Sequence, residues 1–184
     1  LSTSPRRPRD VVVIFLGAND AARLPSYQHT PLAEFEANLV AMLREVALRG
    51  LAAVVVSPPP YVASEWLRVK GYPRSDRDAD TTATYALAAS NAAVTCGVPI
   101  ADVHSAMLRE AQMGGVPVET FLSDGLHLNE AGAKVDFATI NAALAIDDAL
   151  AVDGQQRLER AAQPTTAAAG EDAAGDVLGW GDAG

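Results

Sequence analysis

The sequence predicts an α/β fold in which helices cover both faces of a parallel sheet. Short runs of apolar, mostly β-branched residues alternate with longer segments whose apolar residues recur every three or four positions. The first pattern is typical of strands buried on both faces, and the second is typical of amphipathic helices. Repeated strand–helix units place their strands parallel in one sheet, so we expect a three-layer α/β/α arrangement.

The first strand and helix carry the clearest signals. Residues 11–16 form a continuous apolar run, which predicts a strand buried on both faces. The helix that follows is expected to have Thr30 as its N-cap, Pro31 at its first position and Gly50 at its end. Its apolar residues form one stripe at helical spacing: Leu32, Phe35, Leu39, Met42, Leu43 and Val46.

The rest of the chain repeats this pattern in shorter segments. Three consecutive prolines follow the second expected strand and end it, because proline cannot continue a central strand. A polar stretch over 64–80 predicts a surface excursion. The other expected elements are a strand over 52–56, a helix over 81–95, a strand over 98–103, a helix that starts just after its cap Asp102, and a helix from the N-cap Asn129 to about Ala145.

Composition divides the chain into an arm, one domain and a tail. Residues 1–10 form a polar arm, and residues 149–184 are acidic and rich in Ala and Gly, which predicts a disordered tail. Residues 11–148 between them form the domain. Only three strands are expected in it, so the sheet is predicted to lack its first strand or strands and to expose an apolar edge around 11–16.

Charge, cysteine content and hydropathy exclude several classes of function. The net charge is -9, and residues 147–184 hold eight acidic and two basic residues. This balance argues against nucleic acid or an anionic membrane as a partner. Cys96 is the only cysteine, so no disulfide forms within the chain and a buried free thiol is expected. No apolar run could span a bilayer and no signal peptide is recognisable, which makes the cytoplasm the default compartment.

Two segments could carry chemistry at the carboxyl ends of strands, where open parallel sheets bind ligands. Asn19 lies directly after the first strand, and its amide could donate to a developing oxyanion, although Asn is also an ordinary turn residue. Asp124 lies three residues before His127, so its carboxylate could fix the tautomer of an imidazole that acts as a base. The alternative is a loop aspartate that caps local amides beside a structural histidine.

Other side chains are weaker candidates. His29 at the start of a helix is expected to be a structural or pocket-rim residue. Tyr61 and Trp66 follow the proline loop and either wall an acyl pocket or simply pack against the excursion. The three histidines, His29, His104 and His127, show no ligand spacing, so we expect no zinc site.

Four segments together resemble the SGNH hydrolases, also called the GDSL esterases and lipases, and in particular the isoamyl-acetate-hydrolysing esterase group. They occur in the family's order and at the expected places on the strand–helix pattern, and the resemblance covers roughly residues 10–146. The segments are Gly-Ala-Asn-Asp-Ala at 17–21, Gln-His-Thr-Pro-Leu at 28–32, Ser-Pro-Pro-Pro at 57–60 and Phe-Leu-Ser-Asp-Gly-Leu-His-Leu at 121–128.

The resemblance implies hydrolysis of small carboxylic esters by a serine, without a metal or an organic cofactor. It implies that Asn19 is an oxyanion-hole amide, that His127 is the general base and that Asp124 orients it. The family's Gly-Asp-Ser nucleophile block and its second oxyanion block, which precede the Gly-Ala-Asn-Asp segment, do not occur in this sequence. The candidate substitutes Ser2, Ser4, Ser57 and Ser123 do not lie on a strand-to-helix elbow, so no nucleophile is identified.

Two hypotheses follow from this combination. In the first, the sequence is an incomplete chain of a serine ester hydrolase whose nucleophile lies upstream. In the second, the chain is a non-catalytic or vestigial protein that keeps the cleft and binds a ligand or partner. Retention of Asn19, Asp124 and His127 together favours the first hypothesis.

Overall fold

A three-stranded parallel sheet forms the centre of the molecule. The structure, a computed structural model, describes the backbone of residues 10–161 and the side chains up to residue 145. The strands are β1 (Val11–Phe15), β2 (Ala52–Val56) and β3 (Ile100–Ala101), in the spatial order β1-β2-β3. Both pairings are parallel, so the three carboxyl ends meet at one edge of the sheet, where ligand sites of such folds lie.

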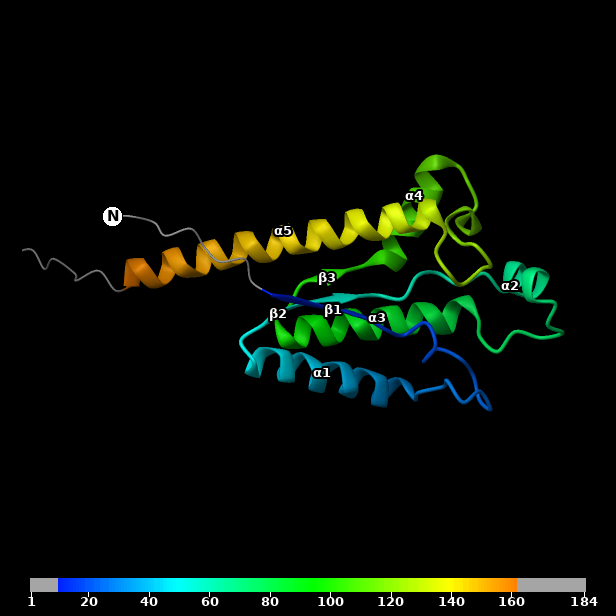
Figure 1. Cartoon of the computed structure of the whole chain (residues 1–184), viewed down its shortest axis with the longest axis horizontal. Helices are drawn as coiled ribbons and strands as arrows, with labels where there is room; N and C mark the ends of the chain where they lie inside the picture. The colour runs from blue at the N-terminus through cyan, green and yellow to red at the C-terminus, as the bar shows by residue number, and fades with distance from the viewer. Residues whose placement is uncertain (1–9, 162–184) are drawn as a thin grey trace, which may run out of the picture.

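Helices cover both faces of this sheet, as the sequence predicts. In Figure 1, α1 (Leu32–Leu48) and α3 (Ala79–Cys96) lie on one side of the strands, and α5 (Glu130–Ala161) lies on the other side with α4 (Val103–Gly114) at its end. The short helix α2 (Ala63–Lys70) lies beyond the carboxyl ends of the strands. Across residues 10–161, no helix combines the length and apolar character needed to cross a membrane.

The central strand β2 shows why its sequence is apolar throughout. Ala53 and Val55 point into a core shared with α1 and α3, whereas Val54 and Val56 point into a second core shared with α4 and α5. All four side chains are buried. Successive residues of a strand face opposite sides, so a central strand between two helix layers needs apolar residues at every position.

Strand β1 is exposed on one face, and the predicted burial on both faces is wrong. Ile14 is buried against α1, but Val11, Val13 and Phe15 are 40, 47 and 39% exposed. Val13 pairs with Val54, so it faces the α5 side of the sheet, where α5 packs over β2 and β3. In the described part of the chain β1 pairs only with β2. The predicted apolar edge is therefore confirmed.

Three element boundaries differ from the sequence prediction. Helix α1 begins one residue later than expected, with Pro31 rather than Thr30 at its N-cap. Helix α3 begins earlier because the Asp78 carboxylate caps it, accepting the Thr81 N–H at 2.7 Å. Strand β3 is shorter than 98–103 because the Val98 N–H still donates to α3, at Ala93 O, and Asp102 already caps α4.

Two longer segments also differ. The excursion over 64–80 contains α2, and α5 continues to Ala161 instead of ending near Ala145, since its sequence is rich in the strong helix formers Ala, Leu, Gln and Arg. Residues 149–161, predicted to begin the disordered tail, belong to α5, whereas residues 1–9 and 162–184 lie outside the described residues, so the polar arm and the rest of the tail stay predictions. Cys96 is free, as expected, but only half-buried.

Candidate active site

A pocket of about 280 Å³ opens at the carboxyl end of β1. The end of β1 and the turn after it, residues 15–20, line the pocket together with Pro59 after β2. Residues 126–128 complete the lining. The pocket therefore brings Asn19 and His127, which are distant in the sequence, to the same cavity.

The turn after β1 is held by its own backbone and by Asp20. The Gly17 N–H donates to Asp20 Oδ2 at 3.1 Å, and the Ala21 N–H donates to Gly17 O at 3.0 Å. Gly17 has a φ of +112°, and a Cβ there would lie 3.1 Å from both the Phe35 ring and the Pro58 ring. A glycine is thus required, and Asp20 rather than Asn19 satisfies the turn, while Asn19 lines the pocket.

Asp124 and His127 form a hydrogen-bonded pair. His127 Nδ1 lies 2.9 Å from Asp124 Oδ2, and the other carboxylate oxygen accepts the backbone N–H of Leu126 at 3.1 Å and of His127 at 2.9 Å. Asp124 is buried, whereas the His127 side chain is 64% exposed. One ring nitrogen is therefore fixed by a buried carboxylate, and the ring itself borders the pocket.

The surroundings of Asp124 favour its ionised form. Burial opposes ionisation, but hydrogen bonds from the His127 backbone N–H, the Lys70 ammonium, the His127 ring and the Leu126 N–H together hold the pKa of the Asp124 carboxyl well below its usual range. The Lys70 contact, Nζ to Oδ2, is 2.8 Å long. A carboxylate that stays charged can keep the proton of His127 on Nδ1, which leaves Nε2 free to accept another.

Gly125 docks this turn against α2. Its carbonyl accepts the Val62 N–H at 2.9 Å, and its φ is +85°. A Cβ at Gly125 would lie 2.4 Å from Val62 O and 2.7 Å from Trp66 N. The turn and the start of α2 therefore meet backbone to backbone, which places the Trp66 ring 6.2 Å from the His127 ring, centroid to centroid.

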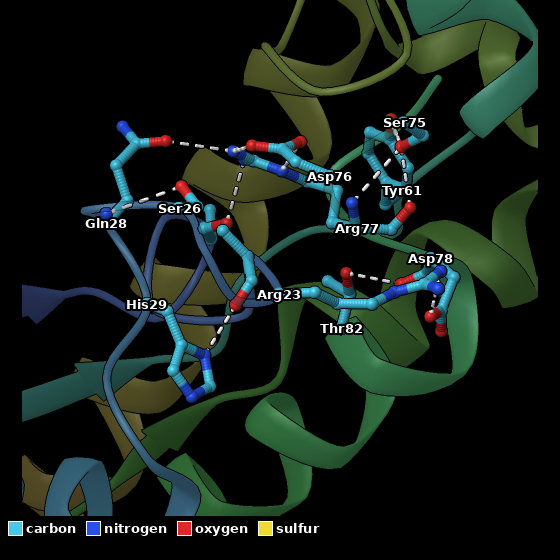
Figure 2. A network of polar contacts seen from close by, with 12 residues as sticks. Arg23, Ser26, Gln28, His29, Tyr61, Ser75, Asp76, Arg77, Asp78 and Thr82 are labelled. Carbon is cyan, nitrogen blue, oxygen red and sulfur yellow. Dashed lines mark hydrogen bonds and ion pairs between the residues drawn. The ribbon is translucent and has the colours of Figure 1, made fainter.

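Arg77 is a buried residue that the sequence analysis missed. Its side chain is 2% exposed, and Figure 2 shows it reaching from the loop before α3 toward Gln28 in the loop after β1. Nη1 donates to Ala18 O at 3.1 Å, and Nη2 donates to Gln28 Oε1 at 3.0 Å. Asp76 balances its charge, with contacts of 3.1 Å to Nε and Nη2. Since Ala18 precedes Asn19, Arg77 fixes the backbone of the pocket wall.

The weaker candidates have structural surroundings. His29 Nδ1 lies 2.5 Å from Ala22 O, and Figure 2 shows this contact within the loop after β1. Tyr61 is buried and bonded to Ser75 Oγ at 2.6 Å, and its ring meets Trp66 edge to face. His29, Tyr61 and Trp66 all lie outside the pocket lining. They support the walls of the pocket rather than forming them.

The hydroxyls of the candidate serines Ser57 and Ser123 take part in structural hydrogen bonds. Ser57 is fully buried, and its hydroxyl donates to Asp102 at 3.0 Å. The Ser123 hydroxyl donates to the backbone oxygen of His127 at 3.1 Å. Among residues 10–161, the pocket lining includes no serine, and no three His, Cys, Asp or Glu side chains gather closely enough to hold a metal ion.

Comparison with known proteins identifies the family. Residues 1–135 match the model of the GDSL-like Lipase/Acylhydrolase family. The chain belongs to this family. Among curated proteins, the isoamyl acetate-hydrolyzing esterase 1 homolog of Bos taurus is 34% identical over 134 residues, which cover 69% of this chain and 52% of that protein. A GDSL esterase/lipase of Arabidopsis thaliana is 32% identical over 140 residues, which cover 70% of this chain and 56% of that protein.

Solved structures of hydrolases share the fold. The lipase/acylhydrolase from Enterococcus faecalis superposes with a TM-score of 0.56 at 27% identity, covering 71% of this chain and 58% of that one. The acetylxylan esterase from Geobacillus stearothermophilus has a TM-score of 0.54 at 20% identity, covers 71% of this chain and 57% of that one, and shows the fold alone. The predicted SGNH hydrolase fold is confirmed. The chain spans about half the length of the curated relatives it matches.

Proposed function

We propose that this domain supplies the base, its orienting carboxylate and an oxyanion donor to a serine hydrolase of small carboxylic esters. The observation that carries the proposal is the 2.9 Å bond between Asp124 and His127 at the edge of the pocket that Asn19 also lines. Membership of the GDSL-like lipase/acylhydrolase family supports the same reaction class.

Each residue has a defined role in the proposed mechanism. His127 Nε2 takes the proton of the attacking serine hydroxyl while Asp124 stabilises the imidazolium that forms. The serine oxygen bonds to the ester carbonyl carbon, and the Asn19 amide donates to the oxygen that becomes negative. His127 then gives its proton to the departing alcohol. Water, deprotonated by His127, hydrolyses the acyl-serine in the second half of the cycle.

The nucleophile is proposed to come from outside residues 10–161. The pocket lining over this range contains no serine. The pocket lies at the end of β1, and one edge of β1 pairs with no other strand of the described residues. The curated relatives are about twice as long as the part this chain matches. A further strand beside β1 would bring its own carboxyl end to the pocket, because parallel strands end at the same edge.

A short acyl or alcohol group suits the pocket best. Its volume is near the lower limit for small-molecule sites, and its lining is mostly apolar: Phe15, Leu16, Ala18, Pro59, Leu126 and Leu128. Several relatives are named for hydrolysis of isoamyl acetate, an ester of a short acid and a short alcohol.

The decisive experiment begins with the 5′ end of the native transcript. We expect an in-frame upstream segment that contains Gly-Asp-Ser. The protein translated from it should hydrolyse p-nitrophenyl acetate faster than the octanoate ester, and His127→Ala should abolish this activity. If the transcript encodes no such segment, or the longer protein leaves both esters intact, catalysis is rejected in favour of a ligand-binding role for the pocket.

A further inference from the structure

We infer that Lys70 is a positioning residue, whose ammonium group holds the Asp124 carboxylate and shares with His127 the oxygen that orients the imidazole. Lys70 Nζ lies 2.8 Å from Asp124 Oδ2, and His127 Nδ1 lies 2.9 Å from the same atom. Asp124 Oδ1 is already occupied by two backbone N–H groups. The ammonium and the imidazole therefore compete for one buried oxygen.

The fold holds Lys70 in this position at both ends of α2. The first turn of α2 is fixed to the candidate site through the Val62–Gly125 hydrogen bond, and Lys70 is its last residue, directly before the left-handed Gly71. The Lys70 ammonium lies 4.9 Å from the centre of the Trp66 ring, which shields it further. The Lys70 side chain is 34% exposed, whereas the Lys134 side chain, in an ordinary surface pair with Glu130, is 74% exposed.

This arrangement sets the charge balance around the base. When His127 takes a proton, Asp124 Oδ2 lies between two cations, so Lys70 weakens the stabilisation that the carboxylate gives the imidazolium. The other charged or titratable groups near the pair are Tyr61, Glu65 on α2, which Arg68 neutralises, and Asp20, which lines the same pocket as His127. The Tyr61 and Arg77 side chains also contact the Trp66 ring. Lys70 is thus the cation in direct contact with the pair among the described residues.

The consequence for catalysis is that Lys70 affects how firmly Asp124 orients His127, because the ammonium and the imidazole share Asp124 Oδ2. This consequence rests on the proposed function. The charge coupling itself does not, because it is a property of the three side chains and can be measured on the protein whether or not it hydrolyses esters.

The composition of the chain allows a direct NMR test. The sequence contains three histidines and two lysines, so labelling of these residue types gives few and assignable signals. In the Lys70→Met variant, which keeps the length of the side chain and removes its charge, the titration midpoint of His127 should rise by about one pH unit. Lys70→Arg should restore the wild-type midpoint, and Lys134→Met should leave it unchanged.

A second measurement needs no substitution at the site. In the wild-type protein, the Nζ signal of Lys70 should show an inflection at the pH where His127 titrates, whereas the signal of Lys134 should not. An unchanged His127 midpoint in a folded Lys70→Met protein, or the absence of the inflection, would overturn the inference. A coupled Lys70 in a longer protein that leaves esters intact would reject the proposed function alone. In an active longer protein, Lys70→Met should also move the acidic limb of the pH–rate profile upward by the same amount.

Discussion

Serine, aspartate and histidine meet at two places in this molecule, and the two places behave differently. In the turn over 123–127, the carboxylate of Asp124 is buried and the imidazole of His127 is largely exposed beside a pocket. At the ends of β2 and β3, the hydroxyl of Ser57 is fully buried between Asp102 Oδ1, at 3.0 Å, and the backbone N–H of His104, at 3.1 Å.

The difference between the two clusters lies in what each group bonds to. Asp102 also accepts the Ser105 N–H at 3.1 Å, so the Ser57 cluster ties two strand ends to the first turn of α4 and acts as a cap. In the Asp124 cluster, a side-chain carboxylate meets a ring nitrogen, and a solvent-accessible ring remains. The same residue types therefore serve stability in one place and suit proton transfer in the other.

The largest expected effect comes from changing the two aspartates in a protein that carries the nucleophile. Asp124→Asn should lower kcat by about 10⁴-fold, because an amide no longer stabilises the imidazolium or its tautomer. Asp102→Asn should leave kcat within a few-fold and lower the free energy of unfolding by about 1 kcal/mol, since asparagine also caps helices. Parallel ester-hydrolysis and urea-unfolding measurements check both. Equal losses of kcat in the two variants would erase the distinction between the clusters.

The two serines should differ in stability rather than activity. Ser57→Ala leaves the His104 N–H without its acceptor and removes one of the donors to the Asp102 carboxylate, which keeps the Ser105 N–H, so the free energy of unfolding should fall by about 2 kcal/mol. Ser123→Ala removes one bond at the surface and should cost less than about 0.5 kcal/mol. Urea unfolding followed by circular dichroism measures both values. A stable Ser57→Ala protein would show that the cap is dispensable.

The smallest effect concerns pH. Burial lowers the pKa of His104 from its ordinary value, against the opposing charge of Asp102. As the pH falls, His104 in the unfolded chain binds a proton near pH 6.5, before His104 in the folded protein does. The contribution of His104 to the free energy of unfolding is therefore complete above about pH 6.5, and it is lost as the pH falls through the pKa of His104 in the folded protein. His104→Gln should flatten the dependence of unfolding free energy on pH just below 6.5, whereas Ser123→Ala should keep the wild-type slope. The same slope in both variants would contradict this assignment.

The sequence predicts the strands and helices whose apolar residues follow a regular pattern. It does not predict how far each one is buried, because burial depends on which other elements cover it. β2 was predicted with its observed bounds, because a central strand is apolar at every position. β1 carries the same pattern and is nevertheless exposed on one face, since a run of apolar residues does not reveal what covers it. Helix α2 escaped prediction because it is eight residues long, has no buried residue and depends on its contact with Gly125.

The candidate site divides in the same way. Asp124 and His127 lie in one turn, so their spacing left open a bond to the ring or a cap on local amides, and the structure contains both. Asn19 was expected at the ligand-binding edge of the sheet because it directly follows β1, and it lines the pocket there. The catalytic roles of Asn19, Asp124 and His127 stay predictions. Lys70 and Arg77 could not be found, because their partners Asp124 and Ala18 lie more than fifty positions away and only the fold joins them.

Arg77 has a practical consequence for redesign of the pocket. Its buried guanidinium joins the loop after β1 to the loop before α3, together with the Arg23–Asp76 and Arg23–Asp78 contacts, and it lies outside the pocket lining that a substrate would touch. Libraries that aim at a new acyl preference should therefore vary Phe15, Leu16, Leu126 and Leu128 and hold position 77 constant. A library that randomises Arg77 should lose stability rather than gain specificity, because it removes the buried contacts of the guanidinium with Ala18 and Gln28.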